Sequence, residues 1–229
     1  MKRANGITLA ATALALVTVA SAQAQEQVQK VTDGGVKVPG WAAKIDATRE
    51  NTGLTIADAR FAKEGEAFKV TTGPAITYWS AANKATGNYT VKATFTEAKQ
   101  TYNHPHPFGV FIGGSDLESG AANALYCAAY RNGNYIIRMF SGGKRVDVVG
   151  KPVPNDAVRK AAPEAEVVQE VAWTVKGDNV QCLVNGTAVW TGTRADLTGA
   201  GKLPSLDGIA GIRVSHNSDA LVTNFAVTK

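Results

Sequence analysis

Eighteen residues from Trp173 to Trp190 limit the fold sharply, because apolar and polar side chains alternate along them with a period of two. Successive side chains of a β-strand point to opposite faces, so this alternation indicates strands with one face on a core. A turn at 176–179 and the pair Asn185-Gly186, a type I′ hairpin signal, separate the alternating runs. The stretch therefore predicts consecutive strands joined by hairpins.

The same alternation recurs along most of the chain from Trp41 onward, in short runs separated by turn residues. The exception is 155–166, whose Asn/Asp start and alanine-rich body predict about two turns of helix ending near Pro163. Many short strands spaced by roughly ten residues predict an all-β fold, a two-sheet antiparallel jelly-roll sandwich with one short helix, as a single domain over 41–229. The other expected strands are 75–79, 89–98, 107–112, 125–131, 135–140, 144–149, 208–215 and 220–228.

Residues 1–24 have the order of a secretory signal peptide. Met1-Lys2-Arg3 is followed by an apolar run from Ile7 to Ala20 and then by small residues, which predicts cleavage after Ala24 or, as a second choice, after Ala22. The polar segment 25–40 is expected to be a flexible lead-in. We therefore predict an exported chain, periplasmic or secreted. We expect no membrane span in the mature chain, because no later segment reaches the roughly 20 apolar residues that a spanning helix needs.

The charge balance argues against a nucleic-acid partner. The chain has 24 Lys+Arg and 19 Asp+Glu, and removing Lys2 and Arg3 with the signal leaves 22 against 19, a formal charge of +3. The remaining basic residues are dispersed and form no cluster interleaved with aromatics, which is the pattern typical of a nucleic-acid surface. We therefore expect no nucleic-acid partner.

Cys127 and Cys182 are the two cysteines of the chain. Each lies on the apolar side of its strand, so the alternation predicts that both side chains point into the core. An oxidising compartment permits a disulfide between them. Two buried free thiols would also pack as small hydrophobes, so the sequence leaves both possibilities open.

Several runs of residues resemble a known group of sandwich domains. WTVKGDNVQCLVNGTAVW followed by GIAGIRVSHNSDALVTNFAV is similar to the C-terminal half of concanavalin A-like, or laminin G-like, domains, in particular the secreted bacterial domains grouped with the 3-keto-disaccharide hydrolase family. The runs ATGNYTVKATF, FGVFIGG and ALYCAAYRNGNYIIRMFSGG fit the same pattern. The resemblance covers roughly 41–229 and implies a concanavalin A-like lectin or glucanase sandwich. It carries over no catalytic residue, since one fold hosts many functions.

The most unusual cluster in the sequence is His104-Pro105-His106-Pro107. Residues two apart in an extended segment share a face, so His104 and His106 can converge on a ligand. These two ligands do not make a site by themselves, because a zinc centre needs at least three protein ligands and the only other histidine is His216. We therefore expect no metal and interpret the cluster as a strand entrance stiffened by proline. His106 and His216 are candidate residues for hydrogen bonds to sugar hydroxyls at the mouth of a groove.

Acidic residues do not supply the pair that glycosidases use. Those enzymes place two carboxylates around the scissile bond, and laminarinase-type relatives of this fold carry them as Glu-x-Asp-x-x-Glu or Glu-x-Asp-x-Glu on one strand, a motif that this sequence lacks. The nearest pair, Asp116 and Glu118, lies in a glycine-flanked turn where solvated acids are expected. Asp116 would suit calcium, but the six or more oxygens that calcium takes cannot be assembled from the sequence, so we expect no cofactor.

One strand face has the composition of a binding surface. On 125–131 and 135–140, the residues opposite the core-facing set are rich in aromatic and basic side chains. If the two strands are neighbours, these side chains form a patch on which sugar rings can stack and to which arginine supplies donors. Alternatively, a loop covers this face. Trp79 and Arg131 are weaker additions to the patch. The four candidate ligand-binding residues on this face are Tyr126, Tyr130, Arg138 and Phe140.

These observations favour a secreted or periplasmic carbohydrate-binding β-sandwich module, with a glycan or glycan-like partner and no evident catalytic acid pair. The first alternative is a glycoside-cleaving enzyme resembling 3-keto-disaccharide hydrolases, which would need His106 or Asp116. A second alternative is a structural or cell-envelope interaction module, which burial of the aromatic face would favour. The sequence has no Gly-x-Ser-x-Gly, His-Glu-x-x-His or phosphate-binding motif to support acyl transfer, zinc proteolysis or nucleotide chemistry.

Overall fold

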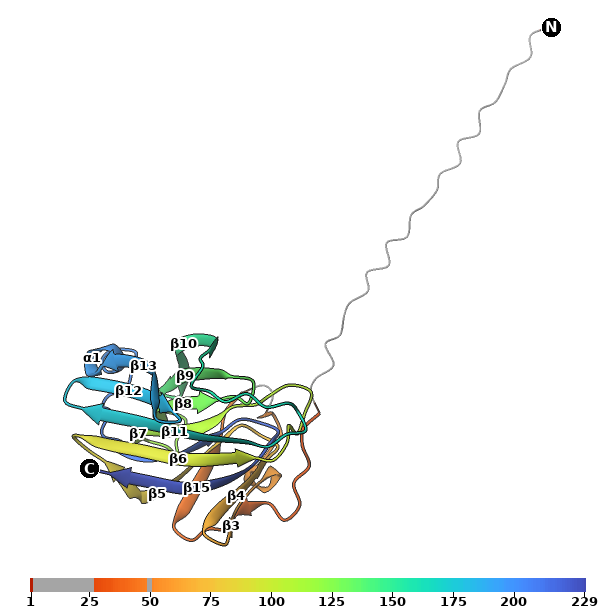
Figure 1. Cartoon of the computed structure of the whole chain (residues 1–229), viewed down its shortest axis with the longest axis horizontal. Coiled ribbons are helices and arrows are strands. Elements are labelled where there is room, and N and C mark those ends of the chain that lie inside the picture. The colour runs from red at the N-terminus through yellow and green to blue at the C-terminus, as the bar shows by residue number, and fades with distance from the viewer. Residues whose placement is uncertain (2–26, 49–50) are drawn as a thin grey trace.

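A computed structural model describes residue 1, residues 27–48 and residues 51–229. In this part of the chain two β-sheets pack face to face around one core (Figure 1). The eight-stranded sheet has the order β1 (Gly35–Val36), β3 (Ala59–Glu64), β4 (Ala67–Thr72), β15 (Ser218–Thr228), β6 (Tyr89–Glu97), β11 (Val167–Lys176), β12 (Asn179–Val184), β13 (Thr187–Thr193). The seven-stranded sheet has the order β10 (Lys144–Pro154), β9 (Asn134–Ser141), β8 (Asn123–Ala129), β7 (Phe108–Ser115), β14 (Gly208–Val214), β5 (Ile76–Ala85), β2 (Trp41–Ile45).

The strand pairing confirms the predicted antiparallel sandwich. Within the described residues β1 and β3 form the one parallel pair, and every other pair is antiparallel. Each predicted strand range overlaps an observed strand. The hairpin between β12 and β13 has positive φ at both Asn185 (51°) and Gly186 (81°), as a type I′ turn requires. Trp173 is fully buried and packs edge-on against Trp190 at 6.0 Å between ring centroids.

The sandwich has one short α-helix, as predicted, but it lies elsewhere in the chain. Helix α1 (Arg194–Leu197) follows β13, and a 3₁₀ turn, η2 (Ile56–Asp58), precedes β3. The helix predicted at 155–166 is wrong, because this segment forms turns.

Two buried side chains explain why 155–166 does not become a helix. The Arg131 guanidinium donates hydrogen bonds to the carbonyls of Ala162 and Ala165. Gln169 accepts from the backbone N–H of Arg159 at 3.1 Å and donates to its carbonyl at 2.8 Å. These bonds satisfy backbone groups that a helix would pair internally, so tertiary contacts override the local alanine preference.

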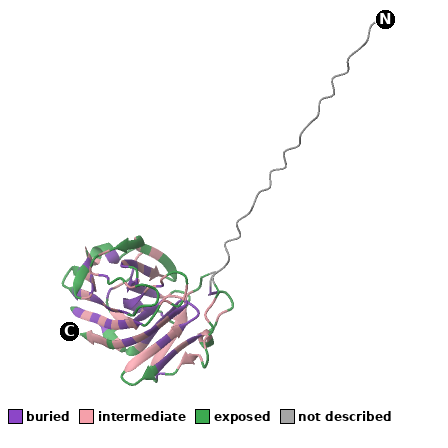
Figure 2. Cartoon of the chain, turned by 45° about the vertical axis from the view of Figure 1, so that its right-hand side comes forward, coloured by how far each residue is buried: buried purple, intermediate pink, exposed green. Residues whose placement is uncertain are grey.

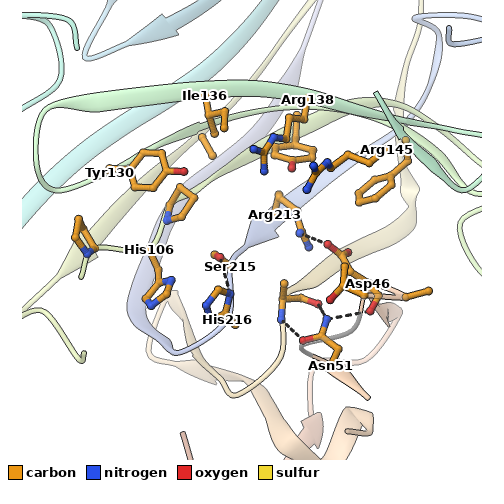
Figure 3. Close-up of a pocket in the computed structure, with 18 of the residues that line it drawn as sticks. Asp46, Asn51, His106, Tyr130, Ile136, Arg138, Arg145, Arg213, Ser215 and His216 are labelled. Carbon is orange, nitrogen blue, oxygen red and sulfur yellow. Dashed lines mark hydrogen bonds and ion pairs between the residues drawn. The ribbon is translucent and has the colours of Figure 1, made fainter. Parts of the chain in front are cut away.

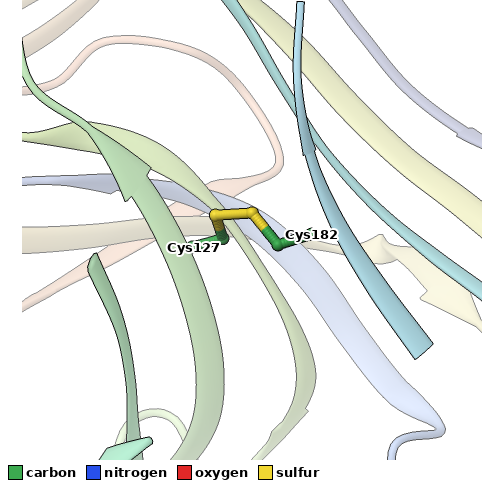
Figure 4. Close-up of a disulfide and its surroundings, with 2 residues drawn as sticks. All are labelled: Cys127 and Cys182. Atoms are coloured by element: carbon green, nitrogen blue, oxygen red, sulfur yellow. A yellow bond between two sulfur atoms is a disulfide. The ribbon is translucent and has the colours of Figure 1, made fainter. Parts of the chain in front are cut away.

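A disulfide between Cys127 and Cys182 joins the two sheets (Figure 4). Cys127 lies on β8 and Cys182 on β12, both are fully buried, and their Cα atoms are 6.2 Å apart. The two cysteines point inward, as the alternation predicted. Of the two possibilities that the sequence left open, the structure has the disulfide.

The two predictions for the N-terminal part of the chain have different outcomes. The predicted signal peptide, 1–24, and its cleavage sites lie outside the described residues apart from residue 1. The segment 25–40 was expected to be a flexible lead-in, and the structure describes it from residue 27. There Gly35–Val36 pairs with β3, and Gln29 donates to the Asn217 side chain at 2.7 Å. These contacts attach 27–40 to the sandwich. None of the helices among the described residues has the length and apolar content to cross a membrane.

Strand β8 is buried along its whole length, so the seven-stranded sheet is covered on both faces at this strand. Its inward residues Leu125 and Cys127 belong to the core between the sheets. Its outward residues Tyr126 and Ala128 belong to a second, smaller apolar cluster on the outer face. Figure 2 shows the buried residues along the strands and the exposed ones at turns and edges. The outer face therefore has a packed apolar floor.

The disulfide should contribute strongly to stability. It closes a loop with a sequence separation of 55 residues, and chain entropy predicts that such a cross-link stabilises the fold by about 4 kcal/mol. We expect a Cys127→Ala/Cys182→Ala variant to lose about that amount in urea unfolding, and the wild type to lose it only when a reductant is present. If reductant leaves the wild-type unfolding curve unchanged although both thiols become alkylated, the expected stabilisation is wrong.

A buried acid should make stability depend on pH. Glu97, at the end of β6, is buried with its Oε2 3.1 Å from Arg131 Nη1. Burial raises the pKa of Glu97 from 4.5 to about 7, while Arg131 opposes the shift. Because this folded-state pKa exceeds the unfolded one, the neutral carboxyl contributes stability that is complete below about pH 4.5 and is lost as pH rises through about 7.

We therefore expect wild-type stability to fall relative to Glu97→Gln between pH 5 and pH 8, by on the order of 3 kcal/mol. Glutamine resembles the neutral carboxyl and removes this titration. Urea unfolding at a series of pH values measures the difference in free energy of unfolding between the two proteins. A difference that stays constant over this pH range would contradict the raised pKa.

Candidate functional site

A pocket of about 430 Å³ lies on the outer face of the seven-stranded sheet (Figure 3). Its floor comes from β8, β9 and β14, and its walls from the segment after β2, the loop before β7, the turn between β9 and β10 and the turn after β14. We call it the outer-face pocket. All six ligand-binding candidates from the sequence line it. They are Tyr126, Tyr130, Arg138, Phe140, His106 and His216.

The strand register explains why the floor residues meet. Strands β8 and β9 are antiparallel neighbours, and Tyr126 pairs with Arg138 while Ala128 pairs with Ile136. Arg213 on β14 lies across Gly109 from Ala128. Gly109 and Ala128 are small and lie between larger side chains, so they leave room for the outer-face pocket. Gly109 admits nothing larger, since an added Cβ would be 1.9 Å from the Cys127 carbonyl oxygen.

Tyr126 is buried rather than available as an open stacking surface. It is 6% exposed, and the Arg213 guanidinium lies over its ring at 5.2 Å from the centroid and 5.9 Å from that of Phe140. Phe140 and Tyr130 are half-buried. The expected aromatic patch therefore has two layers, with Tyr126 beneath Arg213 and with Tyr130 and Phe140 reaching the pocket. Burial raises the pKa of Tyr130 further above its ordinary value of 10, so its hydroxyl stays protonated and able to donate.

Arg213 and Asp46 form a buried ion pair that the sequence interpretation missed. Their side chains are 8% and 11% exposed, and Arg213 donates to Asp46 Oδ2. Burial raises the pKa of Asp46, and the Arg213 charge opposes this rise. Asn51 donates to the Asp46 carbonyl at 2.9 Å and holds the same segment over the sheet. The alternation of β14 could have revealed Arg213, since it lies between the inward residues Ile212 and Val214.

A second charged group lies at the β9–β10 side of the pocket. Asp147 Oδ1 is 2.8 Å from Arg138 Nε and 3.6 Å from Arg145 Nε. Arg138 and Arg145 line the pocket and Asp147 does not. With Arg213, three guanidinium groups face the pocket region against the two carboxylates that pair with them. This excess of positive charge makes the pocket suitable for a ligand with an acidic group.

The other acidic and aromatic candidates lie away from this pocket. Asp116 and Glu118 line a separate depression, and Asp116 accepts a hydrogen bond from Asn123 at 3.4 Å. Trp79 lines that depression and a small neighbouring cavity of about 70 Å³. Arg131 is 1% exposed and supports the 155–166 turns. The structure therefore does not bring Asp116 together with His106.

The three histidines of the chain converge on one wall of the outer-face pocket. Ring centroids are 4.5 Å apart for His104 and His106, 4.1 Å for His106 and His216, and 6.5 Å for His104 and His216. Among the described residues they are the group of three or more His, Cys, Asp or Glu side chains with the spacing to hold a metal ion. Figure 3 shows His106 and His216 side by side below Tyr130. The sequence predicted that His104 and His106 share a face and named His106 and His216 as candidates at one groove, but it did not predict that all three rings meet.

Comparisons with known proteins show the fold without placing the chain in a family. No protein-family model matches the chain, and no curated protein does. A carbohydrate-binding module, CBM66 from Bacillus subtilis, superposes with a TM-score of 0.57 at 10% identity, over 85% of this chain and 98% of the module. A galectin-like protein of unknown function from Bacillus subtilis gives 0.53 at 15% identity, over 82% and 88% of the two chains. The Emp46p carbohydrate recognition domain, as a mutant, gives 0.51 at 10% identity, over 82% and 88%.

These similarities support the concanavalin A-like type of sandwich that the sequence resemblance implied. At such low identity they establish the fold alone. The narrower resemblance to 3-keto-disaccharide hydrolases stays a prediction.

Removing the carboxylate of the buried ion pair should destabilise the protein. Asp46→Ala leaves the Arg213 charge buried without its partner, and such a change costs about 3 kcal/mol. Asp147→Ala is the matched control, because Asp147 is 36% exposed and its partners Arg138 and Arg145 are 24% and 57% exposed. Pairs so close to solvent contribute less than about 1 kcal/mol. Urea unfolding of both variants measures the contrast, and equal losses would show that burial of the Asp46 pair does not decide its contribution.

Proposed function

We propose that the chain is an exported carbohydrate-binding β-sandwich module that holds a glycan in the outer-face pocket. The observation that carries this proposal is the convergence of the six candidate side chains, from separate strands and turns, on one pocket of about 430 Å³. Ligand pockets of this size combine apolar surface with a few convergent polar groups. The pocket has both, so it suits a sugar, which has an apolar ring face and a rim of hydroxyls.

Different residues of the outer-face pocket suit different parts of a sugar. Tyr130 and Phe140 offer half-buried aromatic rings on which a sugar ring can stack. Arg138 and Arg145 supply guanidinium donors at the pocket edge, and their positions are held by Asp147. His106 and His216 add ring nitrogens on the opposite wall. Because the guanidinium groups outnumber the carboxylates paired with them, we propose that the preferred glycan carries an acidic group.

The acid content of the pocket favours binding over hydrolysis by paired carboxylates. Asp46 is the one carboxylate among the described residues that line the pocket, and it is buried against Arg213. Retaining and inverting glycosidases both need two carboxyl groups around the scissile bond. Similar solved structures include a carbohydrate-binding module and a carbohydrate recognition domain, which agrees with a binding role.

Two observations support export. The order of charged, apolar and small residues at the start of the chain is that of a signal peptide. The disulfide between Cys127 and Cys182 is the kind of bond that persists in oxidising compartments such as the periplasm or the extracellular space. We therefore propose a periplasmic or secreted location.

Calorimetric titration with a panel of neutral and acidic oligosaccharides tests the binding proposal. We expect at least one acidic glycan to bind, with an affinity that weakens as salt is added. Tyr130→Ala should reduce this affinity about fivefold by removing the stacking ring, because aromatic stacking contributes about 1 kcal/mol. Arg138→Ala should reduce binding of acidic glycans more than that of neutral ones.

The matched control is Arg60→Ala, which removes a guanidinium group from β3 in the other sheet. This variant should bind the glycan as the wild type does. Absence of binding across a broad panel would overturn the proposal. So would a bound glycan whose affinity responds to Arg60→Ala as strongly as to Arg138→Ala.

A further inference from the structure

We propose that His104, His106 and His216 form a binding site for a divalent transition-metal ion of the zinc type. One ring nitrogen from each of the three histidines lies within 4.8 Å of the other two. These are all the histidines of the chain, and they come from two segments more than a hundred residues apart. Dispersed surface histidines would not be expected to meet in this way. The proposal does not depend on glycan binding, since the histidines alone supply the ligands.

The pairing of two strands brings the histidines together. Strands β7 and β14 are antiparallel neighbours, with Phe108 opposite Val214. The hydrogen bond from the Ser215 N–H to the Pro107 carbonyl, at 3.0 Å, extends this pairing one step beyond the strands. The loop before β7 therefore lies beside the turn after β14. The sheet register thus brings His106 and His216 near each other, and the exposed His104 lies two residues before His106 in the same loop.

The spacing is close to what a single ion requires. Zinc binds histidine nitrogen at about 2.0 to 2.1 Å, so two nitrogens on a tetrahedral ion lie about 3.3 Å apart. The upper limit of 4.8 Å between the three nitrogens exceeds this value by about 1.5 Å, which rotation of the imidazole rings can close. Pro105 and Pro107 flank His106 and restrict the backbone on both sides of it. The site is thus nearly preorganised.

Neighbouring polar groups orient two of the rings. His104 Nδ1 lies 2.9 Å from the Asn103 side-chain oxygen, which accepts a hydrogen bond from a protonated Nδ1. His216 Nδ1 lies 3.3 Å from Ser215 Oγ, a hydroxyl that can also accept. Protonation at Nδ1 leaves the lone pair on Nε2, one of the two ring nitrogens through which a neutral histidine binds a metal. Such supporting hydrogen bonds are typical of metal-ligating histidines.

The ligand type selects the class of metal. Three imidazoles suit zinc, copper, nickel or iron, whereas calcium and magnesium require oxygen ligands. Both cysteines are in the disulfide, so no thiolate competes for the ion. Three protein ligands leave a fourth position of a tetrahedral ion open. Because the three histidines line the outer-face pocket, an ion held by them would stand at the pocket wall, within reach of a ligand oxygen.

The test uses the mature chain without a histidine tag, stripped of metal with a chelator. Titration with Zn²⁺ should show one ion per chain by calorimetry, and Co²⁺ should give the intense visible absorption of a four- or five-coordinate site. Since the chain has three histidines in all, imidazole NMR signals provide a direct count. One equivalent of Zn²⁺ should shift the signals of all three histidines together.

Substitutions distinguish the residues that bind the metal ion from residues that only lie near it. His104→Ala changes an exposed residue and should keep the fold while weakening Zn²⁺ binding at least about 100-fold, and His106→Ala should do the same. Asn103→Ala should weaken it about tenfold through the lost hydrogen bond. Asp116→Asn is the control, because Asp116 lies outside the pocket, and should leave binding unchanged.

Several results would overturn the proposal: no saturable binding at one equivalent, shifts in fewer than three histidines, or unchanged affinity in folded His104→Ala. Tyr130→Ala distinguishes the metal site from the glycan site. This variant should keep its Zn²⁺ affinity while its glycan affinity falls. Loss of Zn²⁺ binding in Tyr130→Ala with the fold intact would contradict a site made by the histidines.

Discussion

Burial of β8 on both faces is the constraint that links the core of this protein to its pocket. All seven residues of β8 are buried, with Cys127 inside the sandwich and Tyr126 under the pocket. A shift of one residue in register would exchange the two faces, exposing the apolar core set and burying the pocket set. The disulfide from Cys127 to β12 opposes such a shift. The same register places Tyr126 opposite Arg138 on β9, so the pocket floor depends on the core pairing.

The alternation of apolar and polar residues was sufficient to predict the sandwich and part of the site. The face of the sheet to which a side chain points depends only on its position along its own strand. The alternation gave the outward positions of Tyr126 and Arg138 without knowledge of the neighbours. It could not give the order of strands in the sheet. Arg213 faces outward by the same rule, yet its role appears only when β14 is known to lie beside β7. His106 and His216 were candidates for the same groove, but their close ring contact follows from the same strand order and could not be predicted from the sequence.

The helix that was wrongly predicted at 155–166 shows that specific tertiary hydrogen bonds can outweigh local helix propensity. Alanine-rich segments gain at most a few tenths of a kcal/mol per residue from helix propensity. A hydrogen bond to a charged group contributes about 1.5 to 3 kcal/mol, and Arg131 makes two to the carbonyls of 155–166. Gln169 makes two more. Arg131 is also the partner of buried Glu97. The turns of 155–166 therefore supply the carbonyl acceptors that the buried Arg131 guanidinium needs in addition to Glu97.

The end of β14 contributes to both the floor of the pocket and its histidine wall, and this makes the two dependent on each other. Arg213 and Ser215 are two residues apart and share a face at the end of β14, and His216 follows directly. A buried ion pair often costs stability relative to apolar residues. We therefore interpret the Asp46–Arg213 pair as fixing the positions of the two segments that it joins. It ties the segment after β2 to β14 and holds Arg213 over Tyr126. A movement of the end of β14 would therefore shift Arg213 and His216 together, which couples the floor of the pocket to the histidines on its wall.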